Sequence, residues 1–423
     1  MLLSLLSKNS SIILILTILL TYFIPNFLSI DRIGNQWLYL SVVNIFGILL
    51  IYFKHQARFK LISFKNIYVL RWYLLFIFTG LVSLFVASNI IESIITLSQY
   101  YNCLIALYLL YYFLSEIKNP KNTVIAIFFG LLICEIYFSF SPILEDLLNK
   151  KPQFRSMAYK GLAANINITS FSLVFKLPIL FYLISVTNKF YKKLILSILL
   201  IIVLFVTYIL GTRGAFLGIL ISIIFYLLHI VLNLKNIKKN LPSLFLIIAS
   251  IFLSVIFNLT LNSGKRNSSV LDRASSISIS ANDGSVNQRL RYYKHGLDQF
   301  LTTPLFGIGI GNWKLKSIEY DKENILGYTV PYHAHNDFIQ ILAEQGIFGF
   351  TFYLMVFISF MFLFYKNKLI QEDNFYVFVM ASFFIYFLDS NLNFPIARPI
   401  SVLQFLFLLA FVSLNQNVYE SEK

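Results

Sequence analysis

The chain has 423 residues, of which 58% are hydrophobic and only 13% are charged, and its mean hydropathy is +0.75. Soluble proteins carry about a quarter charged residues, so this composition excludes an ordinary soluble enzyme and indicates a polytopic membrane protein. Its two cysteines, Cys103 and Cys134, both lie in apolar stretches, which argues against a disulfide framework and against a cysteine metal site.

About twelve apolar stretches have the length of a membrane helix, which predicts an all-α fold. The first stretch is interpreted as a retained span, because it is too long for a signal peptide core and lacks a small-residue cleavage site. The spans are predicted near residues 11–29, 37–53, 72–88, 93–115, 123–141, 168–186, 194–210, 214–233, 242–260, 337–365, 374–392 and 398–416.

Lysine and arginine are frequent in one alternate set of connections, and only Arg32, Arg213 and Arg398 occupy the short loops of the other set. By the positive-inside rule, both termini are predicted to be cytoplasmic. The net charge of +15 is therefore largely a topology signal, and no nucleic-acid partner is expected. This places predicted spans 1–9 in residues 1–260, a large external loop in 261–335, and spans 10–12 with a cytoplasmic tail in 336–423.

The external segments 142–167 and 261–335 are basic beyond what topology requires, which favours membrane lipids or lipid-linked phosphates as partners. Within the longer loop, residues 286–301 place Leu290, Tyr293, Leu297, Phe300 and Leu301 at helical spacing. This predicts an amphipathic helix lying on the membrane surface or on the helix bundle. Arg289 and Tyr293 share one face, whereas Arg291 points elsewhere and is expected to be solvated or to face lipid.

A turn rich in glycine follows this helix, with Gly307, Gly309 and Gly311. No strand precedes it, so a nucleotide site is not indicated, and the turn is expected to seat Trp313 at the membrane interface. Two charges in predicted spans are also unusual. Lys176 either snorkels to the interface or reaches a cavity, and Glu344 either stabilises helix packing or supports a site.

His335 is expected at the first turn of the tenth predicted span, with Asn336 or Asp337 as the cap. The positive end of a helix dipole would keep this imidazole neutral. Gly346 and Gly349 follow His335 by about three and four helical turns, so they are expected to lie near its face and to allow close helix packing. Near the last two spans, Asp389 is expected to pair either with an arginine of the site or with Arg398.

Three motifs occur in a fixed order: Thr-Arg-Gly around Arg213; Arg289 with an aromatic four residues later, before a Pro-Leu-x-Gly-x-Gly turn; and His335-Asn336, nine residues, Gly346, two residues and Gly349. In this the chain resembles the O-antigen ligase and O-antigen polymerase (Wzy-C) superfamily. The resemblance implies a membrane glycosyltransferase of the GT-C class that needs no metal or other cofactor. Its implied partners are an undecaprenyl diphosphate-linked glycan as donor and lipid A-core or another glycan as acceptor.

The resemblance implies that His335 is the general base and that Arg213 and Arg289 bind the donor diphosphate. A guanidinium can bind phosphate oxygens in a bidentate way, but an interfacial arginine can also simply contact lipid headgroups. His333 is expected to contact substrate or to be merely interfacial, because two histidines alone make an incomplete zinc site. The predicted function is O-antigen ligation on the periplasmic face of a bacterial inner membrane. A polymerase or protein O-oligosaccharyltransferase is the first alternative, and a transporter of lipid-linked sugars is a more distant one.

Overall fold

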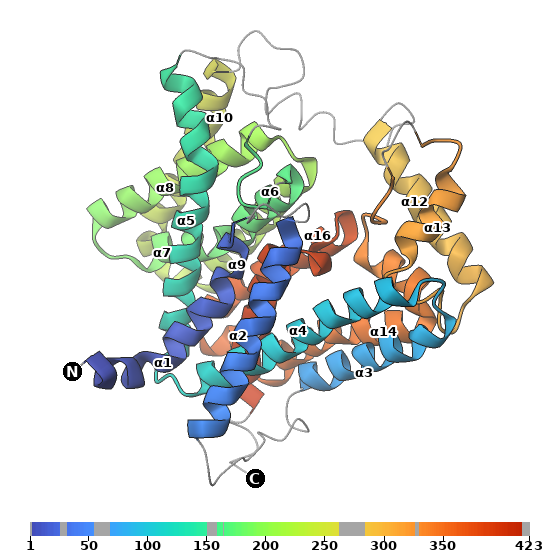
Figure 1. The fold of residues 1–423 in the computed structure, drawn as a ribbon. Helices are drawn as coiled ribbons and strands as arrows, with labels where there is room; N and C mark the ends of the chain where they lie inside the picture. Colours follow the sequence, from blue (N-terminus) through green and yellow to red (C-terminus); the bar gives the residue numbers. More distant parts are fainter. Residues whose placement is uncertain are drawn as a thin grey trace. The chain divides into compact units, whose positions relative to one another are not determined.

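The computed structural model of the protein describes residues 2–25, 32–54, 68–149, 159–163, 165–261, 284–325 and 330–416. Within these ranges the regular secondary structure consists of helices, and no strand is present (Figure 1). The predicted all-α membrane fold is therefore confirmed. Ser275, in the serine-rich part of the long loop, and the basic residues between 55 and 67 lie outside the described residues.

Every predicted span falls on a helix, and ten helices in the described part of the chain are long and apolar enough to cross a membrane. The first and twelfth predicted spans fall on shorter apolar helices, Ser10–Phe23 and Pro399–Ser413. The first of these is the apolar part of a longer helix that begins at Leu2, and Pro25 follows it closely. The second begins only at Pro399 and has 15 residues, fewer than the roughly 17 needed to cross the hydrocarbon core. The twelve expected spans thus fall on ten long apolar helical segments, one of which is divided into Ile166–Phe175 and Leu177–Val186, and on two shorter ones.

The chain divides by its internal contacts into two compact units, and the first comprises residues 1–120, 279–368 and 390–423. Within it α14 packs along α3 and α17 packs along α4, with aromatic contacts such as Phe76 to Tyr353 at 5.2 Å between ring centroids. Helix α17 is buried along its whole length. The helices of this unit are α1 (Leu2–Leu19), η1 (Leu20–Phe23), α2 (Arg32–Lys54), α3 (Tyr68–Ser83), η3 (Leu84–Val86), α4 (Ile90–Ser115), α12 (Gly284–Thr302), α13 (Trp313–Asp321), α14 (Asp337–Lys366), η6 (Pro395–Ala397), α17 (Pro399–Ser413) and η7 (Leu414–Gln416).

Helix α12 confirms the predicted amphipathic helix and packs against α14. The contact uses Gly296, where an added Cβ would lie 2.4 Å from Cγ2 of Ile339, and the buried ring of Tyr292. The leucines of the predicted apolar face are instead exposed, Leu290 by 49%, Leu297 by 45% and Leu301 by 73%. Helix packing therefore depends on a glycine contact that hydrophobic periodicity does not reveal.

The second unit comprises residues 121–278 and 369–389. In it α8 pairs with α10, and α6 packs on α9, where Gly218 allows Val174 to approach closely. The helices are α5 (Pro120–Leu148), α6 (Ile166–Phe175), α7 (Leu177–Val186), α8 (Phe190–Leu210), α9 (Arg213–Leu232), η5 (Leu234–Asn236), α10 (Ile237–Leu261), α15 (Leu369–Glu372) and α16 (Phe375–Leu392), and the ends of α5 and α16 extend one and three residues beyond the unit.

Lys176 lies at the break between α6 and α7, where Pro178 lacks the N–H that a continuous helix would need. Its Nζ is 3.0 Å from Oε1 of Glu135, and both side chains are less than 5% exposed. Ser172 links the pair, since its hydroxyl donates to Glu135 Oε2 at 2.8 Å and lies 3.1 Å from Lys176 Nζ. Lys176 therefore neither snorkels to the interface nor faces a cavity; it is neutralised inside the unit.

Candidate active site

The histidine motif forms the turn that leads into α14. Asn336 is the N-cap: its Oδ1 accepts a hydrogen bond from the Ile339 N–H at 3.1 Å, and its Nδ2 donates to the carbonyl oxygen of Asn391 at 3.3 Å. Asp337, the other predicted cap, is buried and accepts instead from the backbone N–H of Ile396 at 3.2 Å. These contacts attach the start of α14 to the segment that precedes α17.

His335 has a left-handed backbone conformation, with φ at 56°, which is uncommon for a residue other than glycine. The Tyr293 hydroxyl lies 3.0 Å from its carbonyl oxygen and 2.9 Å from that of Asn391. The imidazole ring stacks over Tyr292 at 6.3 Å and meets Phe394 edge-on at 5.1 Å. Neighbouring groups thus fix both the backbone and the ring of His335.

The surroundings of His335 keep its imidazole neutral. Burial and then the positive charge of Arg289 lower the pKa of His335 from 6.5 to about 4. Its Nδ1 is buried and forms no hydrogen bond with the described residues. At neutral pH this side chain is therefore an uncharged imidazole able to accept a proton. The neutral state was predicted from the helix dipole, but its principal causes are burial and Arg289.

Arg289 lies one helical turn before Tyr293 on α12, and its charge acts on both Tyr293 and His335. Arg289, Tyr293 and His335 therefore lie near one another in the first unit. The expectation for Arg291 is wrong. Its Nε donates to Oδ1 of the buried Asp321 at 2.6 Å and its Nη2 to Oδ2 at 3.2 Å, so it ties α12 to α13.

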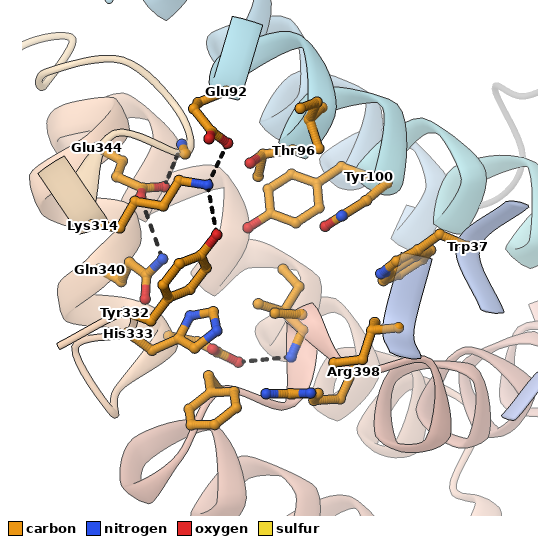
Figure 2. Close-up of a pocket in the computed structure, with 18 residues that line it drawn as sticks. Trp37, Glu92, Thr96, Tyr100, Lys314, Tyr332, His333, Gln340, Glu344 and Arg398 are labelled. Atoms are coloured by element: carbon orange, nitrogen blue, oxygen red, sulfur yellow. Dashed lines mark hydrogen bonds and ion pairs between the residues drawn. The ribbon is translucent and has the colours of Figure 1, made fainter. Parts of the chain in front are cut away.

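A cavity of about 470 Å³ lies next to the histidine turn (Figure 2). His333 is on its wall and stacks on Phe394 with ring centroids 4.1 Å apart, while the guanidinium carbon of Arg398 is 4.9 Å from the centre of the same ring. Burial, followed by the charge of Arg398, lowers the pKa of His333 to about 3. Of the two histidines, His333 lines this cavity. The Phe394 ring contacts both imidazole rings.

Several cavity residues have no counterpart among the predicted site residues. Lys314 of α13 forms an ion pair with Glu92 of α4, and its Nζ donates to the Tyr332 hydroxyl at 3.0 Å. Trp37 and Phe394 add aromatic surface. The only sequence signal at Glu92 is its place in the first turn of a helix, where a carboxylate is favourable for ordinary electrostatic reasons. Its partner is 222 residues away, and no local pattern identifies it.

The glycine-rich turn packs on α14. The N–H groups of Ile308 and Gly309 donate to the carbonyl oxygens of Ala343 and Glu344 at 3.1 and 2.9 Å. The Glu344 carboxylate accepts from the N–H groups of Gly311 at 2.9 Å and Trp313 at 3.0 Å. Glu344 is therefore a buried structural acceptor on the cavity wall. Trp313, predicted at the membrane interface, is completely buried.

Gly346 interrupts α14, with φ at 66° and ψ at −162°. An added Cβ would lie 2.3 Å from the carbonyl oxygen of Leu305, and the next N–H, that of Ile347, donates to the carbonyl oxygen of Pro304 at 2.9 Å. The prediction of one continuous helical face through Gly346 and Gly349 is therefore wrong. The backbone must leave the helix here to receive the glycine-rich turn, and glycine adopts this conformation without steric cost.

Two predicted site residues belong to the second unit. Arg213 is half-buried and begins α9 directly after the cap residue Thr212. Asp389 is 2% exposed and lies in the last part of α16. Their participation in one site with His335 stays a prediction, as does the choice between the two pairings expected for Asp389.

Comparison with known proteins identifies a family for part of the chain. Residues 195–354 match the family described as O-antigen ligase, whereas a search of curated proteins finds no match. The matched segment runs from α8 into α14 and includes Arg213, Arg289, His335, Gly346 and Gly349. Together with the ten apolar helices and the ordered motifs, this match confirms the resemblance over residues 195–354, the part of this membrane protein that is similar to the O-antigen ligase family.

Proposed function

We propose that the protein is a membrane glycosyltransferase that moves a glycan from an undecaprenyl diphosphate carrier to an acceptor hydroxyl, with lipid A-core as the first-choice acceptor. The observation that carries this proposal is the environment of His335. Its imidazole is neutral, its Nδ1 has no hydrogen-bond partner among the described residues, and its pKa responds to Arg289. A proton acceptor beside a cation suits attack by a hydroxyl on a donor that leaves as an anion.

In the proposed reaction the acceptor hydroxyl gives its proton to His335 while its oxygen attacks the anomeric carbon of the donor. The bond from that carbon to the diphosphate oxygen breaks, and the diphosphate leaves with the electron pair, so the configuration inverts. Arg289 and Arg213 would stabilise the departing negative charge, because guanidinium groups bind phosphate oxygens in bidentate geometry.

Donor binding also changes the base. The positive charge of Arg289 lowers the pKa of His335 in the free protein, whereas a bound diphosphate brings negative charge to the same place. An opposite charge nearby favours the imidazolium, so the pKa rises when the donor is bound. His335 would therefore become a stronger base only with the lipid diphosphate in place, which limits unproductive proton uptake.

Localisation and substrate follow from the same proposal. The protein would lie in a bacterial inner membrane with both termini in the cytoplasm and with His335 on the periplasmic side. The principal alternative within the superfamily is glycan polymerisation or protein O-glycosylation, which uses the same chemistry with another acceptor. A transporter of lipid-linked sugars is less favoured, because residues 195–354 match the O-antigen ligase family and the histidine motif lies at a helix start. The buried Lys176–Glu135 pair and the helix breaks at Lys176 and Gly346 are features that transporters also have.

The test is glycan transfer by purified protein from an undecaprenyl diphosphate-linked glycan to lipid A-core. His335→Ala is expected to reduce the rate by about 100-fold or more, the usual contribution of a general base. His295→Ala is the matched control, because His295 lies on α12 and stacks on Tyr320 at 5.3 Å, away from the base. Full activity of the His335 variant would refute the assignment. Transfer to carrier-linked repeats but not to lipid A-core would establish the polymerase alternative.

A further inference from the structure

The cavity beside the histidine turn has walls from α2, α4, α13, the start of α14 and the segment before α17, all within the first unit. Figure 2 shows Tyr100, Trp37 and Arg398 on one side, and Lys314, Tyr332 and His333 on the other. Its volume of about 470 Å³ lies in the range of small-molecule sites. The mechanism proposed for His335 and Arg289 does not require this space.

Trp37 lines the cavity and has a polar atom without a hydrogen-bond partner among the described residues. The residue is only 6% exposed, yet its indole Nε1 forms no hydrogen bond with the described residues. Buried tryptophan N–H groups usually have a partner, and leaving one unpaired is unfavourable. Across the cavity, His333 Nδ1 is also buried without a hydrogen-bond partner in the described ranges. Two polar atoms of one cavity thus lack partners that a bound molecule can supply.

The charges around the cavity favour an uncharged ligand with hydroxyl groups. Lys314 is paired with Glu92, and Asp337, Glu344 and Arg398 add charges of both signs to the lining. The walls are therefore not of a single sign, as a site for a free anion would be. A hydroxyl group both donates and accepts, so it can pair with an indole N–H and also with either tautomer of a neutral imidazole. Aromatic side chains supply the apolar part of the lining.

We propose that this cavity is a subsite for an uncharged sugar unit of a glycan substrate, with the Trp37 N–H donating to one sugar hydroxyl and His333 contacting another. The inference rests on the proposed glycosyltransferase function. Phe394 contacts the rings of both His333 and His335, so a sugar in the cavity lies one aromatic ring away from the base. The volume accommodates about two sugar rings. The sugar belongs either to the acceptor or to the glycan carried by the donor.

The experiment separates these two sources. Initial rates are measured with purified protein while the undecaprenyl diphosphate-linked glycan and lipid A-core are varied independently. Trp37→Phe keeps an aromatic ring but removes the N–H, so KM should rise about 5-fold for the substrate whose sugar enters the cavity, with kcat nearly unchanged. A rise confined to lipid A-core assigns the acceptor, and a rise confined to the lipid-linked glycan assigns the donor.

Trp72→Phe is the matched control, because Trp72 lies outside the cavity and stacks on Phe352 at 6.1 Å. His333→Phe is a second variant that keeps an aromatic ring at Phe394 and should raise KM for the same substrate. Thermal unfolding in detergent verifies that each variant is folded. Unchanged KM values for both substrates in both cavity variants would overturn the subsite. Absence of transfer by the wild-type protein would instead overturn the proposed function on which the subsite rests.

Discussion

Replacing Arg289 by alanine is expected to move the acid limb of the transfer reaction to higher pH. The base must be neutral, so kcat/KM falls as the pH drops through the pKa of His335 in the free protein. Burial and the charge of Arg289 together lower this pKa from 6.5 to about 4. Removing a positive neighbour makes the imidazolium less unfavourable, so the pKa rises and activity is lost at a higher pH.

The size of the displacement follows from the order of the two causes. Burial is the larger, so Arg289 accounts for less than half of the difference between 6.5 and about 4. The limb should therefore move up by at most about 1 pH unit. The assay is kcat/KM for glycan transfer between pH 3.5 and 8, with brief exposure to acid and a return to neutral pH to verify reversibility.

Arg289→Lys provides the control, because it keeps the positive charge but not the planar, bidentate guanidinium. It should lower kcat/KM through weaker diphosphate binding while leaving the limb nearly where it is in the wild-type protein. An unchanged limb in Arg289→Ala would refute the coupling between these two residues. A limb that moves equally far in both variants would show that the charge is not the cause.

Three further predictions concern stability and topology. Gly346→Ala should destabilise the protein by about 2 kcal/mol or more and lower Tm in detergent, because Gly346 has a positive φ and a close backbone contact. Gly130→Ala, with open space around the glycine, should not lower Tm. Equal Tm values for the two variants would contradict this account of the helix break. Lys176→Met should lower the free energy of unfolding by about 3–5 kcal/mol, because it leaves the buried Glu135 without its partner. Adding Glu135→Leu should recover much of this loss. If the losses from the two substitutions simply add in the double variant, the pair is not the cause. Lys294→Cys, at an exposed position of α12, should react with a membrane-impermeant maleimide from outside the cell in a background without the two native cysteines; labelling only after permeabilisation would reverse the proposed orientation.

Helix positions could be predicted from the sequence because membrane helices need long apolar stretches, and that signal is local. The start of α14 was similarly accessible, since an asparagine before an apolar run is a typical cap. The shared face of Arg289 and Tyr293 followed from helical spacing alone. These features depend on residues within a few turns of one another.

Contacts between distant segments could not be predicted in this way. The partner of Arg291 is Asp321 on another helix, and nothing in the sequence around either residue distinguishes the pair from solvated charges. Gly346 has the appearance of a small residue in a packed membrane helix, and only the approach of Leu305 explains its conformation. The cavity likewise depends on helices that are far apart in the sequence.

The break at Gly346 explains why the histidine motif has a fixed spacing. Residues 337–345 form a helical segment about 13 Å long between the cap at Asn336 and the break. His335 lies next to its first residue, and near its last residue the Glu344 carboxylate accepts hydrogen bonds from the N–H groups of Gly311 and Trp313. Inserting a single residue would lengthen this segment by about 1.5 Å and rotate its far end by about 100°. The nine residues of the motif thus set the distance and the orientation of His335 relative to the glycine-rich turn.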